Sequence, residues 1–219
     1  FLMTPPDSDP RPLASIDPDG RIGEKIPLAQ VLGCVLHLTS SCPQPGQVRH
    51  GFGNRLVIGE PAGGRSSRAR RVAEALGQAG FETEVSENVR SEIWYKLWGN
   101  MTMNPVSALT GATSDHILQD SLVREFMGRA MGEAAAIGER IGCPIAQTPD
   151  QRMALTAKLG AFKTSMLQDS EAGKVLEIAA LVTAVHEIAK RVGVPTPHIG
   201  ALLGLARLVA RTRGLYSPG

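Results

Sequence analysis

The sequence predicts an α/β segment followed by an all-helical segment, with the change near residue 86. Two patterns carry this prediction. Up to residue 86, short apolar runs of strand length surround one amphipathic helix. From residue 87 on, apolar residues recur three and four positions apart, and short Gly or Pro connections separate the segments. We therefore expect two domains, at residues 1–86 and 87–219.

The first segment, residues 1–86, is expected to begin with a loop and to continue with strands. Residues 1–26 are rich in Pro and Asp and are expected to have little regular structure. A hairpin is expected across Gly51-Phe52-Gly53-Asn54. This run begins like a dinucleotide-binding fingerprint, but Leu56 occupies the sixth position and a strand follows, so we do not read it as a cofactor loop. Strands are expected at 31–38, 47–51, 55–59 and 81–85, with a turn at 43–46.

Helices are expected wherever the apolar spacing is helical and a Gly or Pro ends the run. Gly80, Gly142 and Gly193 are such stops. The central helix begins at Glu87 or Asn88 and includes the stretch from Ser91 to Gly111. The remaining helices are expected at 66–79, 121–141, 149–167, 175–192 and 199–211.

Bulk composition excludes several classes of function. A hydrophobic content of 42% and a net charge of +2 are typical of an ordinary globular protein and give no electrostatic footprint for nucleic acid. The sequence contains no run of about 18 apolar residues, so no transmembrane helix is expected. Cys34, Cys42 and Cys143 are odd in number and widely spaced, so we expect free, buried thiols in a reducing cytoplasm.

Two other features of the sequence are weaker candidates for a site. The basic cluster of Arg65, Arg68, Arg70 and Arg71 at a helix start could attract phosphate, but a solvated helix face is the better interpretation. The five histidines show no metal-ligand spacing, so no metal site is expected.

The strongest candidate is a polar stripe on the central helix. Lys96, Asn100 and Asn104 are four residues apart, which places them on one face. Apolar residues cover most of the remaining circumference, so the helix is expected to be buried. Pro105 is expected to strain the helix at Asn104, because the residue before proline is disfavoured in α geometry. Spacing alone does not distinguish a solvent-exposed helix edge from an active site.

A second polar group lies further along the chain. Ser165 is expected to end the helix at 149–167. Glu177 stands within the apolar run Val175-Leu176-Glu177-Ile178-Ala179, and its carboxylate is therefore expected to point inward. A buried carboxylate needs a partner, for which Lys96 and the hydroxyls of a ligand are candidates.

These residues, in this order, resemble the ketopantoate reductase (2-dehydropantoate 2-reductase) family. The family carries a Lys-x3-Asn-x3-Asn helix, then a Ser-Met-Leu-Gln-Asp segment, then a Glu-Ile pair. Here they correspond to the stripe, to residues 165–169 and to Glu177-Ile178. The resemblance covers about residues 25–219, including the Pro-Gly-Gln-Val-Arg-His stretch at 45–50 and Ile-Gly-Glu at 58–60.

The resemblance implies NADPH-dependent reduction of a 2-oxo acid such as ketopantoate, in the pantoate and coenzyme A pathway. Lys96 would be the general acid, Asn100 and Asn104 would bind substrate, and Ser165 would meet its carboxylate. Glu177 would contact a substrate hydroxyl or the nicotinamide end of the cofactor. The implied fold is part of a Rossmann-like domain followed by an all-α domain similar to the C-terminal domain of 6-phosphogluconate dehydrogenase. A cytoplasmic enzyme is implied, and a homodimer is left open.

The sequence departs from the family in three places. The glycine-rich loop that binds the cofactor is not found, and the chain begins with Phe1, which indicates an N-terminally truncated form. Ala179 stands where an Asp is common, and Ser114 where some members have a substrate-contacting Asn. We therefore keep two alternatives: a non-catalytic helical dimerisation or ligand-binding module, and a related reductase acting on a different 2-oxo acid. Whether the truncated chain binds NADPH is left open.

Overall fold

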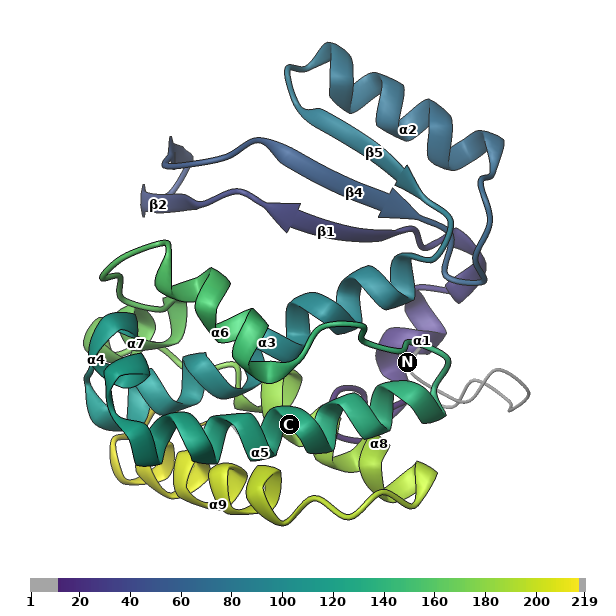
Figure 1. The fold of residues 1–219 in the computed structure, drawn as a ribbon. Coiled ribbons are helices and arrows are strands. Elements are labelled where there is room, and N and C mark those ends of the chain that lie inside the picture. The colour runs from purple at the N-terminus through teal and green to yellow at the C-terminus, as the bar shows by residue number, and fades with distance from the viewer. Residues whose placement is uncertain (1–11, 217–219) are drawn as a thin grey trace. The chain divides into compact units, whose positions relative to one another are not determined.

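The computed structural model describes residues 12–216, so the first 11 residues of the expected N-terminal loop lie outside the described residues. By its internal contacts the chain divides into two units, which are described separately here. One unit is residues 24–96 and the other combines the segment before Glu24 with the chain from Leu97 on. The expected order, strands first and helices after, is confirmed (Figure 1).

The α/β unit is built on a three-stranded sheet in the order β1-β4-β5. Strands β1 (Gly33–His37) and β4 (Arg55–Gly59) are antiparallel, whereas β4 and β5 (Glu82–Ser86) are parallel. Helix α2 (Ser67–Gln78) connects the parallel pair. The Ser66 hydroxyl caps α2 by accepting a hydrogen bond from the Ala69 amide at 3.1 Å.

The core of this unit forms between β4 and α2. Leu56 and Ile58 project from one face of β4 onto Ala73 of α2, and partly buried apolar residues surround them. Val57 on the opposite face is also fully buried. A strand that is buried on both faces reads as a continuous apolar run, which is why the sequence identified β4 clearly.

The expected hairpin between residues 47–51 and 55–59 is wrong. Strand β3 (Gln47–His50) pairs instead with β2 (Ser40–Gln44), in a separate two-stranded sheet. Gly46, with φ of +81°, makes the turn between them. Strand β2 was not expected because Pro43 reads as a turn residue; it lies where the pairing register shifts, between Ser41 and Gln44.

The helical unit is organised around α5 (Ser121–Arg140), which packs against α4 (Ser114–Gln119), α6 (Pro149–Ala157), α8 (Ala184–Val192) and α9 (Pro197–Thr212). Its buried face follows the helical period from Met127 to Ile137 and Gly138. Helix α7 (Ser165–Glu171) and the π-helical segment η2 (Ala179–Thr183) complete the unit. Helix α3 (Val89–Thr110) begins in the α/β unit, and the division between the units falls within it.

Three expected boundaries in the helical part are wrong. The single helix at 149–167 is two helices, α6 and α7, because Gly160 takes a left-handed φ of +73° after α6 ends. The helix expected from Val175 begins only at Ile178 and opens with η2. Helix α4 was not expected, since six residues are too few for a periodic pattern.

The segment before the α/β unit is partly ordered by contacts with the helical unit. Leu13 is buried, and the amides of Ala14 and Ser15 donate to the Glu187 carboxylate, each at 2.9 Å. Residues Arg21–Lys25 form the short helix α1, where loop was expected.

The expected domain boundary at 86/87 immediately precedes α3, whereas the contacts divide the chain ten residues later. The division of the chain into domains at residues 1–86 and 87–219 therefore stays a prediction. A membrane-crossing helix, long and apolar enough, is not found in the part of the chain that the structure describes.

Candidate active site

Helix α3 is the scaffold of the candidate site. Trp94, Trp98 and Met101 are at most 1% exposed, so the expectation of a buried helix is confirmed. Trp98 Nε1 donates to the Met131 carbonyl at 2.8 Å, which ties α3 to α5. The helix continues through Pro105 without interruption, and the expected strain at Asn104 stays a prediction. Dense packing around Val106 and Ala108 provides a tertiary reason for the helix to persist there.

Lys96 lies in the first half of α3, within the α/β unit, and is half-buried. Its Nζ donates to the main-chain carbonyl of Leu36 in β1 at 2.5 Å. Burial lowers the pKa of Lys96, because the charged ammonium loses solvation, and the nearby Cys34 thiol opposes this in part. The Lys96 ammonium is therefore positioned by a main-chain carbonyl of β1, and its pKa is below that of an ordinary lysine.

Asn100 and Asn104 continue the stripe into the helical unit. Asn100 is half-buried, and Asn104 is only 7% exposed. The Asn104 carboxamide makes no hydrogen bond with any other described residue. Its amide atoms are not among the fully buried polar atoms that lack a partner, so they stay accessible and can bind a polar group of a ligand.

Ser165 begins α7 instead of ending a helix, contrary to expectation. Thr164 is the N-cap of α7, and its hydroxyl accepts from the Leu167 amide at 3.2 Å. The exposed Ser165 hydroxyl is therefore not used in capping and can meet a ligand.

The Glu177 carboxylate is exposed, so the expectation that it points inward is wrong. Its apolar neighbours do not all face the core: Leu176 and Ile178 are buried, but Val175 is 57% exposed. Glu177 directly precedes Ile178 and η2, and its carbonyl accepts from the Leu181 amide at 3.1 Å. Single-turn π segments of this kind are frequent at functional sites.

The five expected site residues thus lie on α3, on α7 and directly before η2. Lys96, Asn100 and Asn104 share one continuous helix, α3. Ser165 and Glu177 belong to the same helical unit as the two asparagines, at the starts of α7 and η2 respectively.

Two features beside Lys96 were not found from the sequence. The Leu36 carbonyl is a main-chain group, which no side-chain motif can reveal. Cys34 was expected to be a buried thiol, but it is exposed, as is Cys42, whereas Cys143 is buried; all three are free, as expected. The alternation of buried and exposed residues in β1 was the available signal, since Val35 is buried and its neighbours Cys34 and Leu36 are exposed.

Ser114, which by the resemblance stands where a substrate-contacting Asn was expected in some family members, has a structural role. Its side chain is fully buried, donates to the Gly160 carbonyl at 2.9 Å and accepts from the Phe162 amide at 3.0 Å. It fastens α4 to the segment between α6 and α7.

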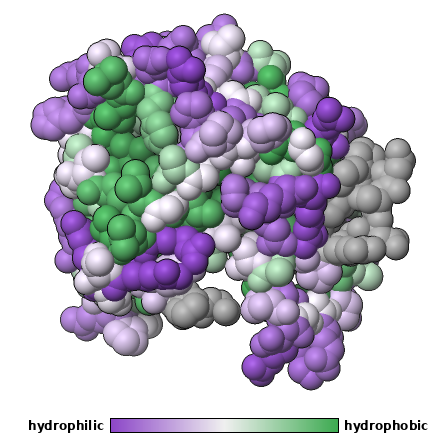
Figure 2. Space-filling model, turned by 90° about the horizontal axis from the view of Figure 1, so that it is seen from below, coloured by the Kyte–Doolittle hydropathy of each residue, from purple (hydrophilic) through white to green (hydrophobic). Residues whose placement is uncertain are grey.

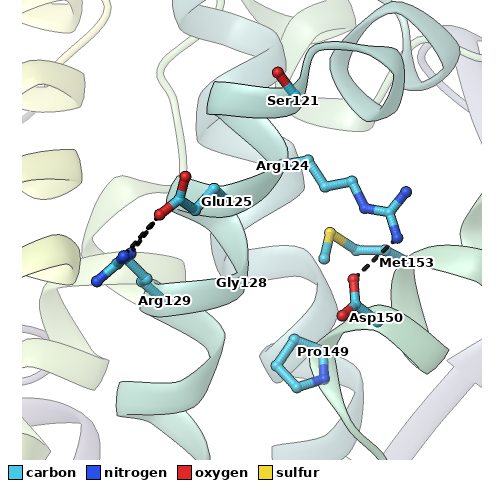
Figure 3. A pocket seen from close by; sticks show the side chains of 8 residues that line it. All are labelled: Ser121, Arg124, Glu125, Gly128, Arg129, Pro149, Asp150 and Met153. Carbon is cyan, nitrogen blue, oxygen red and sulfur yellow. Dashed lines mark hydrogen bonds and ion pairs between the residues drawn. The ribbon is translucent and has the colours of Figure 1, made fainter.

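A hollow of about 600 Å³ lies elsewhere in the helical unit, between α5 and the start of α6 (Figure 3). Its charges pair with each other: Arg124 with Asp150 at 2.9 Å and Arg129 with Glu125 at 2.7 Å. None of the expected site residues lines it. With its arginines neutralised, the hollow has no excess positive charge for a 2-oxo acid.

The arginine cluster at the start of α2 does not form a phosphate site. The Arg68 guanidinium holds the Glu60 carboxylate, with Nε at 2.7 Å, and Arg65 pairs with Glu87 at 3.4 Å. Arg70 and Arg71 are exposed. Within residues 12–216, no cluster of three or more His, Cys, Asp or Glu side chains could hold a metal ion.

Comparison with known proteins identifies the family of this chain. The family model for the ketopantoate reductase PanE/ApbA C-terminal domain matches residues 88–210. A 2-dehydropantoate 2-reductase from Mesorhizobium japonicum is 44% identical over 205 residues, which is 94% of this chain and 63% of that protein.

Solved structures agree as well. A crystal structure from Ralstonia solanacearum MolK2, provisionally assigned as a ketopantoate reductase, has 58% identity and a TM-score of 0.91, covering 94% of this chain and 63% of that chain. The 2-dehydropantoate 2-reductase from Methylococcus capsulatus has 27% identity and a TM-score of 0.81, covering 90% and 68%. The chain thus spans about 63% of the length of the relatives from Mesorhizobium and Ralstonia. It belongs to the ketopantoate reductase family.

Proposed function

We propose that the protein reduces a 2-oxo acid such as ketopantoate to the 2-hydroxy acid, with NADPH as reductant. The observation that carries the proposal is the stripe on α3, in which a lysine of lowered pKa, bound to a main-chain carbonyl, is followed by a nearly buried carboxamide without a partner among the described residues. That arrangement suits the binding and protonation of a carbonyl group, and it lies within a chain of the ketopantoate reductase family.

The reaction needs a hydride at the ketone carbon and a proton at the ketone oxygen. NADPH would supply the hydride. The ammonium of Lys96 donates the proton to the developing alkoxide, and the neutral amine then regains a proton from solvent. A lowered pKa makes this lysine a better acid than an exposed one. The Leu36 carbonyl fixes its Nζ before substrate binds.

Asn100 and Asn104 orient the polar groups of the substrate along the same face of α3. Ser165 meets the substrate carboxylate. Glu177 accepts a hydrogen bond from a substrate hydroxyl, or contacts the nicotinamide end of the cofactor. The position of Glu177 beside η2 and the free hydroxyl of Ser165 support these roles.

The glycine-containing loop after β4 does not fit the pyrophosphate of a dinucleotide. The loop between β4 and α2 contains Gly63 and Gly64, but the Glu60 carboxylate occupies it, held by Ser66 and Arg68. A second negative charge there would be repelled. No reaction step is therefore assigned to this loop, and Glu177 is the one cofactor contact that we propose in this chain.

A related reductase with a different 2-oxo acid is the second candidate. The Ser114 hydroxyl donates to the Gly160 carbonyl and accepts from the Phe162 amide, and Ala179 has no polar side-chain group. By the resemblance, some family members have a substrate-contacting Asn at the position of Ser114 and an Asp at that of Ala179; neither polar group is available to a ligand here, which favours a less polar substrate side chain. We further propose a cytoplasmic location, which the three free cysteines support.

The decisive test is Lys96→Ala in a full-length protein that contains this chain, with NADPH consumption measured against ketopantoate. We expect kcat/KM to fall by about 10²–10⁴-fold, the usual share of general acid catalysis. Lys158→Ala removes an exposed lysine at the end of α6 and is the matched control. Turnover by Lys96→Ala equal to that of the control would exclude Lys96 as the acid. Activity with other 2-oxo acids and none with ketopantoate would favour the second candidate.

A further inference from the structure

Arg152 lies against the main chain of α3, beside the polar stripe. It belongs to α6, which lies next to α3 at this point, and its side chain is partly exposed (Figure 1). A methyl group on Gly99 of α3 would lie 2.9 Å from both Nε and Nη2 of Arg152 and 3.3 Å from its Cζ. Those separations are shorter than the packing distance of such atoms. The guanidinium therefore occupies the space that Gly99 leaves, directly before Asn100.

Gly99 differs from an ordinary helical glycine. Glycine is unfavourable inside a helix, because it loses more backbone freedom on folding than alanine does, and Gly99 lies in the middle of α3. At Gly132 in α5, by contrast, no atom lies within 4 Å of the place of a methyl group. The Arg152 amide donates to the Thr148 main-chain carbonyl at 3.1 Å, a contact that a change of the Thr148 side chain does not remove. Gly99 thus makes room for one guanidinium on a fixed helix.

The proposed substrate brings a negative charge that the residues assigned so far do not neutralise. Asn100, Asn104 and Ser165 are neutral, and Glu177 is a carboxylate itself. The Lys96 ammonium gives its proton to the ketone oxygen and is neutral afterwards. A carboxylate that loses water in a partly buried site needs a cation or several hydrogen-bond donors in exchange. The site therefore lacks one charged anchor.

Four other arginines of the helical unit are weaker candidates for this anchor. Arg124 and Arg129, in the hollow of Figure 3, pair with carboxylates. The guanidinium groups of Arg207 and Arg211 lie 5.8 and 5.2 Å from the ring centre of Tyr216. All four already have a carboxylate or an aromatic ring as a partner within the protein.

The surface over α9 is a weaker candidate as well. Figure 2 views the molecule from the side of α9, and hydrophobic residues gather there on the left. Leu205 and Leu208 of α9 and Leu122 of α5 are 57%, 60% and 75% exposed. An apolar surface offers a carboxylate nothing in place of its lost water. Arg152, beside the stripe, is the group that fits.

We propose that Arg152 binds the carboxylate of the 2-oxo acid, as a charged anchor in addition to the Ser165 hydroxyl. This inference rests on the proposed function and names the group that recognises the substrate as an acid. A guanidinium presents paired N–H donors that match the two oxygens of a carboxylate. Because Arg152 is packed on α3 directly before Asn100, it orients the acid with its ketone along the stripe.

The first test is Arg152→Ala in a full-length protein that contains this chain, with NADPH consumption as the readout. For ketopantoate, kcat/KM should fall by about 10–100-fold, mainly through a higher KM, because one charge-assisted contact is lost. For the lactone of ketopantoate, which keeps the ketone but has no carboxylate, kcat/KM should be unchanged. Millimolar guanidinium chloride should restore part of the turnover of Arg152→Ala but none of that of Lys96→Ala.

Arg129→Ala is the matched control, since it removes an exposed arginine that is paired within α5. It should equal the wild type with both substrates. Failure of the wild type to reduce any 2-oxo acid would contradict the proposed function, and this inference with it. A wild type that reduces ketopantoate, together with an Arg152→Ala variant that equals the control or loses as much with the lactone as with the acid, would overturn this inference alone.

The second test displaces the guanidinium without removing it. Gly99→Ala places a methyl group in the space that Arg152 occupies, so the KM for ketopantoate should rise by about tenfold. Gly132→Ala, which meets open space, should leave KM unchanged. In the Arg152→Ala background, Gly99→Ala should raise KM no further, because the group that it displaces is already gone. Fully additive increases in KM would show that the two residues act separately and would overturn the proposed placement.

Discussion

At the scale of single residues, burial separates the side chains that the protein uses structurally from those that it leaves for a ligand. Ser114 and Asn104 are both buried, but Ser114 has two hydrogen-bond partners and Asn104 has none among the described residues. Sequence spacing alone could not make this distinction, because both are small polar residues in apolar surroundings. The partners of Ser114, the Gly160 carbonyl and the Phe162 amide, are more than 40 residues away in the chain.

Glu60 is the residue whose charge depends most visibly on the fold. Hydrogen bonds from Arg68 and Ser66 lower its pKa from the ordinary 4.5 to about 2. A carboxyl with a lowered folded-state pKa stabilises the protein above its unfolded pKa, and this contribution is lost as the pH falls from about 4.5 towards 2. We expect Glu60→Gln to lower Tm at pH 7 by about 2–4 °C, which corresponds to about 1 kcal/mol.

The difference in Tm between wild type and Glu60→Gln should shrink steadily below pH 4.5 and vanish near pH 2, as followed by thermal denaturation. Glu84→Gln is the control, since its ion pair with Arg55 is about half exposed and should change Tm little. A difference in Tm that is constant with pH would show that the Glu60 charge does not stabilise the fold.

At the scale of elements, α3 and the α6–α7 pair show opposite outcomes for helix-breaking residues. Pro105 reads as a breaker but lies inside α3, where buried neighbours hold the helix. Gly160, with its left-handed φ, separates two helices that the apolar pattern joins. Local propensity is a weak prior, and tertiary packing decides which breaker acts.

The start of α7 supplies the prediction at this scale. Thr164→Ala removes the cap of α7 and should destabilise the protein by about 1 kcal/mol in urea denaturation, whereas Thr164→Ser should keep the cap. Because Ser165 follows the cap, the KM for the 2-oxo acid should also rise in the full-length enzyme.

Thr148→Ala provides the matched control for this prediction, because Thr148 caps α6 with a complete capping box but does not adjoin Ser165. It should lose similar stability with KM unchanged. Equal KM values for the two alanine variants would remove Ser165 from the substrate site.

At the scale of the whole molecule, the chain contains the complete stretch matched by the C-terminal family model but about 63% of the length of its Mesorhizobium relative. The described residues offer no cradle for pyrophosphate, since Glu60 occupies the glycine loop after β4. We therefore expect the 219-residue chain to bind NADPH weakly, with no saturation below about 1 mM in a fluorescence titration. A full-length ketopantoate reductase serves as the positive control. Micromolar binding by this chain would contradict the expectation.

The sequence by itself determined the order of strands and helices, the polar stripe on α3 and membership of the family, because helical spacing and motif order are local properties of the chain. Tertiary structure decided the rest. It paired β3 with β2, divided the helix at Gly160, turned the Glu177 carboxylate outward and placed the Leu36 carbonyl against Lys96. Each of these outcomes depends on partners distant in sequence or on which side of an element the core covers, and neither is encoded in the spacing of neighbouring residues.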